Sequence, residues 1–209
     1  MSKLALGTVQ FGLDYGVSNK VGKVNDEDIK KILILAKKEN IDVIDTAISY
    51  GKSEQVIGNT GITDFKFISK LPDIPKNCIH IDKWIENSVK SSIINLGISH
   101  LDGILIHNTS NFLSENRNEL IKSLIKIKKD GLVKKIGISI YDPIEYEKLM
   151  NMMRFDIVQA PLNIVDRRLV TSGLLSKLRS EGIEIHVRSV FLQGLLLMKR
   201  DSIPTYFEN

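Results

Sequence analysis

The chain has 209 residues, of which 43% are hydrophobic and 26% are charged. This balance is typical of a folded domain and excludes a disordered chain. The formal net charge is +4 and aromatic residues make up only 6%, so a nucleic-acid surface of gathered cations and stacking rings is not expected. The single cysteine, Cys78, excludes an internal disulfide and indicates a reducing compartment, for which we predict the cytoplasm. No apolar run is long enough for a signal peptide or a membrane span, so no membrane partner is expected.

Short apolar segments alternate with segments of helical periodicity along the chain. Strands are predicted over 3–7, 41–44, 65–69, 101–106, 133–138, 155–159 and 183–187. Helices are predicted over 26–39, 80–96, 115–129 and 167–179. A further helix is predicted to begin at Asp142, because a capping aspartate followed by a first-turn proline is typical of a helix start.

Short apolar strands joined by helices indicate an α/β fold with a parallel sheet. We predict a TIM (β/α)8-type barrel, with about seven βα units in one domain over residues 1–209. A doubly wound open sheet is the competing fold, but no Gly-x-Gly-x-x-Gly motif follows the first strand. Residues 194–209 contain no eighth strand pattern, so the barrel is expected to be incomplete at its C-terminal end.

Three consecutive predicted strands end in polar residues. Asp45 ends the second strand, Lys70 the third and His107 the fourth, and Tyr50 lies in the loop after the second. In a parallel barrel these ends share one face, on which catalytic residues gather. Each residue alone has a structural explanation, such as a turn cap or a solvated strand end. Their recurrence at successive strand ends favours a joint function.

Their chemistry fits the reduction of a carbonyl, which needs a hydride on carbon and a proton on oxygen. Tyr50 could supply the proton, and Lys70 is expected to bring the pKa of the phenol down from its reference value of about 10 toward neutral. Asp45 would hold the Lys70 ammonium, and His107 could donate a hydrogen bond to the carbonyl oxygen. The hydride must come from a cofactor.

These motifs resemble those of the aldo-keto reductase family. Four residues stand in the order and local context of that family's catalytic tetrad: Asp45, Tyr50, Lys70 and His107. The segments 44–51, 69–70 and 105–107 are similar to its motifs, and 6–12 is similar to its first strand and loop. The resemblance covers the whole chain. It implies an NAD(P)H-dependent oxidoreductase that transfers a hydride between a nicotinamide cofactor and a small carbonyl or alcohol substrate.

The resemblance also implies a cofactor site for NADPH, with NADH as the alternative. Segment 136–139, Gln159 and Asn163 are similar to the family's nicotinamide pocket. The implied cofactor-binding residues are Thr8, Asp45, Ser139, Gln159, Arg188 and Ser189. The sequence departs from the family pattern at two places. Ile140 occupies a position where many members have asparagine. Arg188-Ser189 occupies a position where many members carry an aromatic ring stacked on the nicotinamide.

The family's eighth strand and following helix bring basic residues to the adenosine 2′-phosphate, and no such segments follow residue 194. Weak dinucleotide binding and self-association through an open barrel edge are therefore expected.

Two other functions remain open. The first is a catalytically impaired barrel that acts as a binding or regulatory module because the C-terminal cofactor-binding part is missing. The second is a lyase that forms a Schiff base on Lys70. The lyase is less favoured because Asp45 would keep the amine charged. A metal site is not expected, because no histidine pair has the spacing of zinc ligands.

Overall fold

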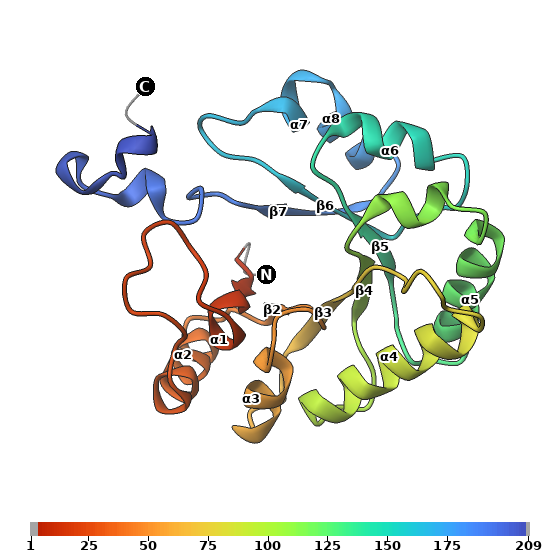
Figure 1. The fold of residues 1–209 in the computed structure, drawn as a ribbon, viewed down its shortest axis with the longest axis horizontal. Coiled ribbons are helices and arrows are strands. Elements are labelled where there is room, and N and C mark those ends of the chain that lie inside the picture. The colour runs from red at the N-terminus through yellow and green to blue at the C-terminus, as the bar shows by residue number, and fades with distance from the viewer. Residues whose placement is uncertain (1–3, 208–209) are drawn as a thin grey trace.

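The computed structural model describes residues 4–207, and these contain a single parallel sheet of seven strands in chain order. The strands are β1 (Leu6–Gly7), β2 (Val43–Asp45), β3 (Lys66–Leu71), β4 (Gly103–Ile106), β5 (Ile136–Ser139), β6 (Ile157–Pro161) and β7 (Glu184–Arg188). The sheet curls into a partial barrel with the helices on its outer face (Figure 1). The predicted α/β barrel with about seven strands is confirmed.

Helices connect the successive strands and cover the convex side of the sheet. They are α1 (Val9–Gly12), α2 (Asp26–Lys38), α3 (Ser53–Asn59), α4 (Ile81–Leu96), α5 (Arg117–Lys129), α6 (Pro143–Leu149), α7 (Arg168–Thr171) and α8 (Leu174–Ser180). Within residues 4–207, no helix combines the length and the apolar character needed to cross a membrane.

The predicted elements are present, with differences at their boundaries. The helix predicted over 167–179 is two helices, α7 and α8, because Gly173 between them has a left-handed φ of 81° that breaks the helix. The first strand is observed only over Leu6–Gly7, and its predicted first residue, Lys3, lies outside the described residues. The helix predicted to begin at Asp142 is α6, which starts at the following proline, and Asp142 and Glu145 form a capping box at its start.

The sheet is open between its first and last strands. Within the described residues β7 pairs with β6 only, and β1 with β2 only. The two sides of this opening meet through the loop after α1 and the segment after β7, which lie beside one another in Figure 1. The Gln193 carbonyl accepts hydrogen bonds from the backbone N–H and the hydroxyl of Ser18, both at 3.3 Å. A loop contact thus joins the two edges without a strand between them.

Alternation along the strands divides the core in two. The larger core fills the space between the sheet and the helices, and a smaller one lies on the opposite face of the strands. The smaller core contains Ile68, Leu105 and Ile157, with Val43 packed against them. Glycine leaves room for this layer: a Cβ at Gly137 would lie 2.4 Å from the Ile157 carbonyl oxygen and 2.6 Å from Leu105 Cδ2.

We predict that Gly137→Ala destabilises the fold by about 1–3 kcal/mol, because the added carbon meets backbone and forces β5 and β6 apart. Urea unfolding measures the change. Gly7→Ala is the matched control, since a Cβ at that β1 glycine meets no atom within 4 Å. Equal stability of the Gly137→Ala chain and the natural chain would contradict the close packing of the inner layer.

Candidate active site

A buried ion pair lies where β2 and β3 end. The Lys70 side chain is only 1% exposed, and its Nζ lies 2.6 Å from Asp45 Oδ1. The same ammonium donates to the Thr46 carbonyl oxygen at 2.8 Å. Burial lowers the pKa of Lys70, and the charge of Asp45 opposes that shift. A buried ammonium is costly unless it is paired, so the contacts that the sequence predicted between these residues hold the charge in place.

The second oxygen of Asp45 is held from the opposite side of the barrel. Gln159 Nε2 donates to Asp45 Oδ2 at 2.6 Å, and Ser139 Oγ donates to Gln159 Oε1 at 3.1 Å. Ser139 and Gln159 are paired residues of β5 and β6 and are nearly fully buried. One polar chain therefore crosses the barrel from β5 to Lys70 on β3. Among residues 4–207, no hydrogen bond uses the second Gln159 amide hydrogen or the Ser139 lone pairs, which suits a carboxamide ligand.

Tyr50 lies in the turn after β2, next to this polar chain. A glycine makes its position attainable, since a Cβ at Gly12 on α1 would lie 1.7 Å from the Tyr50 carbonyl oxygen. Lys70 Nζ is 5.0 Å from the centroid of the Tyr50 ring, and no group within residues 4–207 makes a hydrogen bond to the Tyr50 hydroxyl. The Tyr50 hydroxyl can therefore donate its proton to a hydrogen bond with a ligand.

The pKa of Tyr50 corrects the expectation from the sequence. Burial raises this pKa to about 12, with a smaller contribution from the negative charge of Asp45. Arg188 is the cation whose charge opposes the rise. Lys70 was expected to bring the pKa toward neutral, but its charge is paired with Asp45 at 2.6 Å. The phenol therefore stays protonated at neutral pH.

His107 follows β4 and completes the cluster. Its ring meets the Tyr50 ring edge to face, with centroids 6.1 Å apart and an interplanar angle of 77°. Ser49 Oγ lies 3.3 Å from Nδ1. Burial lowers the pKa of His107, and the charges of Lys70 and Arg188 lower it further. The imidazole is therefore neutral near pH 7, and a Ser49 hydroxyl that donates to Nδ1 leaves the ring proton on Nε2.

Thr8 is placed behind the cluster. Its side chain is fully buried, and its backbone N–H and its hydroxyl both donate to the Asp45 carbonyl oxygen, at 3.0 and 3.1 Å. Ser53 on α3 in turn donates to the Thr8 carbonyl oxygen at 3.0 Å. These bonds fix β1 against β2, so Thr8 supports Asp45 from its backbone side.

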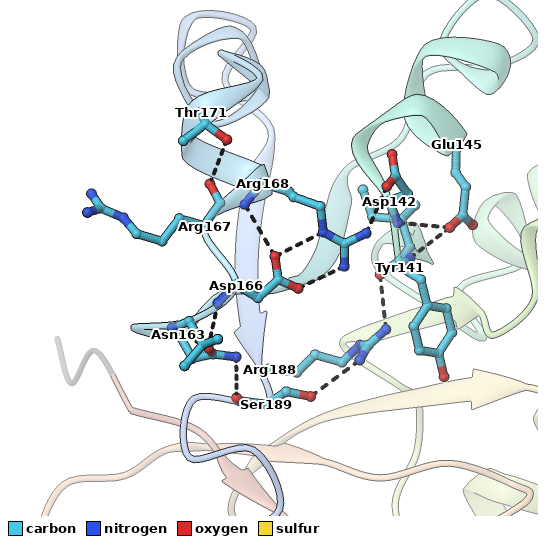
Figure 2. A network of polar contacts seen from close by, with 12 residues as sticks. Tyr141, Asp142, Glu145, Asn163, Asp166, Arg167, Arg168, Thr171, Arg188 and Ser189 are labelled. Carbon is cyan, nitrogen blue, oxygen red and sulfur yellow. Dashed lines mark hydrogen bonds and ion pairs between the residues drawn. The ribbon is translucent and has the colours of Figure 1, made fainter. Parts of the chain in front are cut away.

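Arg188 is the last residue of β7, and Ser189 follows it (Figure 2). The Arg188 guanidinium donates to the Ile140 carbonyl oxygen at 3.0 Å and to Ser189 Oγ at 3.4 Å. It also lies over the Tyr141 ring, 4.2 Å from the centroid. Ser189 has a left-handed φ of 58°, and its carbonyl oxygen accepts from Asn163 Nδ2 at 3.1 Å.

Asn163, which resembles a nicotinamide-pocket residue, is engaged within its own loop. Its Oδ1 accepts from the backbone N–H groups of Val165 and Asp166, at 2.9 and 2.8 Å. Both ends of its amide are therefore bound to the protein.

Two tyrosines near the site were missed in the sequence. Tyr15, in the loop after α1, and Tyr141, directly after β5, are each close enough to Tyr50 to influence a pKa in the cluster. The position of Tyr141 at a strand end was the available signal, whereas nothing local to Tyr15 indicates it. Within residues 4–207, no three histidine, cysteine or acidic side chains gather as metal ligands.

Comparisons with known proteins agree with this arrangement. The model of the aldo/keto reductase family matches residues 3–209. An NADH-specific methylglyoxal reductase of Escherichia coli is 26% identical over 230 residues, covering 98% of this chain and 68% of that protein.

Solved structures show the same fold. A Pseudomonas aeruginosa structure described as an aldo-keto reductase has a TM-score of 0.75 at 25% identity, over 90% of this chain and 73% of that one. An aldo-keto reductase of Bombyx mori in complex with NADP has a TM-score of 0.68 at 20% identity, over 90% of this chain and 62% of that one. The family match over nearly all of the sequence shows that this chain belongs to the aldo/keto reductase family of oxidoreductases.

Proposed function

We propose that this chain reduces a small carbonyl compound, or oxidises the corresponding alcohol, with a nicotinamide cofactor. The observation that carries this proposal concerns Tyr50, whose hydroxyl is unbonded within the described residues and whose ring lies beside both His107 and the Lys70–Asp45 pair. The E. coli relative is named for methylglyoxal, which makes small aldehydes the first substrates to test.

In the proposed reaction the nicotinamide supplies the hydride. Tyr50, protonated at neutral pH, donates its proton to the carbonyl oxygen as negative charge develops there. Neutral His107 donates a hydrogen bond to the same oxygen and fixes its direction. After proton transfer, the charge of Arg188, which opposes the rise in the pKa of Tyr50, stabilises the phenolate electrostatically, and the Lys70 ammonium lies 5.0 Å from the centroid of the Tyr50 ring. Asp45 holds Lys70 in position, and Gln159 holds Asp45.

The cofactor would lie over the ends of β5 to β7. Ser139 and Gln159 would bind the carboxamide of the nicotinamide, and Thr8, Asp45, Arg188 and Ser189 would complete the surrounding wall. We propose NADPH, with NADH as the alternative. The E. coli relative is specific for NADH and the Bombyx mori structure holds NADP, and both support a nicotinamide dinucleotide. Fluorescence titration with each cofactor separates the two.

The competing proposals give different results in the same assays. A chain that binds NADPH but turns over no aldehyde would support a binding or regulatory module. Trapping of a substrate on Lys70 by borohydride would support a lyase. We also propose that the chain works in the cytoplasm, as its single cysteine indicates.

We predict that Tyr50→Phe lowers kcat for aldehyde reduction by about 10²- to 10⁴-fold, because the ring remains and only the acid is lost. Cofactor affinity, measured by fluorescence titration, is expected to stay unchanged. Tyr206→Phe removes a hydroxyl from an 85% exposed ring and is the control. A Tyr50→Phe protein with most of its activity would remove Tyr50 from the acid role.

We predict that Lys70→Met and Asp45→Asn each lose most of the activity and that the double variant loses little more than the worse of the two. The two side chains form one ion pair at 2.6 Å, so their effects are coupled. Steady-state kcat/KM for the four proteins forms the cycle. Losses that simply multiply would show that the two residues act independently.

We predict that the chain self-associates through the open side of the sheet. Exposed apolar side chains lie in the segment after β7, among them Phe191 at 54% and Leu197 at 69%. Sedimentation equilibrium is expected to show a mass that rises with concentration, and Leu197→Ser is expected to reduce that rise. Ile79→Ser, at an 83% exposed residue before α4, is the control. A monomer at all concentrations would contradict the prediction.

A further inference from the structure

Arg188 holds a fixed position beside the cluster. Its guanidinium is bound to the Ile140 carbonyl oxygen and to Ser189 Oγ and is stacked on the Tyr141 ring (Figure 2). These contacts use two of the five N–H groups that an arginine carries. The protein thus orients the guanidinium, and its other three N–H groups donate to no group in the described part of the chain.

The charge of Arg188 has no carboxylate partner within residues 4–207. Asp166 is near enough for Arg188 to lower its pKa, but both of its oxygens accept from Arg168, at 3.0 and 2.8 Å. Asp45 is occupied by Lys70 and Gln159. A partly buried cation without a counter-charge is costly, and such a residue commonly binds an anionic ligand.

Arg188 lies at the carboxyl end of β7, and the parallel sheet places the carboxyl ends of β2, β3 and β4 on the same face. Arg188 lowers the pKa of His107 and opposes the rise in the pKa of Tyr50, so it lies within electrostatic reach of both. The rest of the cluster carries no net charge, because Asp45 neutralises Lys70 and His107 is neutral near pH 7. Around Tyr50, Arg188 therefore gives the site an excess of positive charge.

We propose that Arg188 binds an anionic substituent, a carboxylate in the first instance, on the carbonyl substrate. This inference rests on the proposed function and narrows its substrate class to aldehydes and ketones that carry a negative group. A carboxylate can accept two parallel N–H bonds from a guanidinium, which fixes direction as well as distance. The carbonyl of such a substrate would then be oriented toward Tyr50 and His107.

A phosphate of the cofactor is the other source of an anion, and the test separates the two. Reduction of 4-carboxybenzaldehyde and of benzaldehyde is measured in the natural chain, in Arg188→Met and in Arg167→Met. The two substrates differ only in the charged group. Arg167 is an exposed arginine directly before α7, and its side chain points away from the network in Figure 2, so its replacement controls for the loss of charge.

The natural chain is expected to prefer 4-carboxybenzaldehyde in kcat/KM, and Arg188→Met is expected to lose about 10- to 100-fold of that preference. Arg167→Met is expected to keep it. Arg188→Lys, which retains the charge but not the paired donors, is expected to give an intermediate ratio and decides the matter should Arg188→Met fail to fold. Two results would overturn the proposal. The first is a folded Arg188 variant with an unchanged ratio of kcat/KM for the two aldehydes. The second is a variant that loses affinity for NADPH and NADH but keeps that ratio.

If the natural chain reduces neither aldehyde, the proposed function fails, and binding alone tests Arg188. Calorimetric titration with 4-carboxybenzyl alcohol and with benzyl alcohol is then compared between the natural chain and Arg188→Met. Selective binding of the charged alcohol that is lost in the variant supports the anion site. Absence of selective binding to the natural chain overturns it.

Discussion

The burial of the Lys70 ammonium is the constraint on which the site depends. A charge that is 1% exposed must be matched, and Asp45 and the Thr46 carbonyl oxygen match it at 2.6 and 2.8 Å. The Asp45 carboxylate must in turn be paired at its second oxygen. That oxygen accepts a hydrogen bond from Gln159, whose own side-chain oxygen accepts one from Ser139. Because Asp45, Gln159 and Ser139 come from three different strands, the requirement to pair one charge on β3 fixes β2, β3, β5 and β6 relative to one another.

The inner apolar layer makes this requirement stringent. Ile68, Leu105 and Ile157 fill the barrel at alternate strand positions just below the polar chain. These side chains are at most 3% exposed, and the loss of a hydrogen bond by a polar group beside such an apolar layer is costly. The glycine at 137 is part of the same arrangement, since a side chain would collide with Ile157. The packing of the inner apolar layer and the polar contacts from Ser139 to Lys70 therefore hold the same strands together.

The sequence predicted what local patterns determine. Apolar segments and capping residues located the strands and α6, and strand ends located Asp45, Lys70 and His107. The sequence alone did not predict contacts between segments that are far apart in the chain. The Gln159–Asp45 bond joins residues 114 positions apart, and Tyr15 reaches the site from a loop without periodicity. The break at Gly173 was missed because glycine ends a helix only where the chain adopts a left-handed turn, and packing decides that.

The wrong direction predicted for the pKa of Tyr50 has the same origin as the correct ion pair. The sequence showed a cation near a phenol but not how its charge would be shared. Pairing with Asp45 makes a buried Lys70 tolerable, and Lys70 is not among the charges that shift the pKa of Tyr50, although it still lowers the pKa of His107. Burial then dominates at Tyr50, and the cation that opposes it is Arg188, which has no acidic partner among the described residues. Arg188 thus opposes the effect of burial at Tyr50, whereas Lys70, held by Asp45, acts on His107.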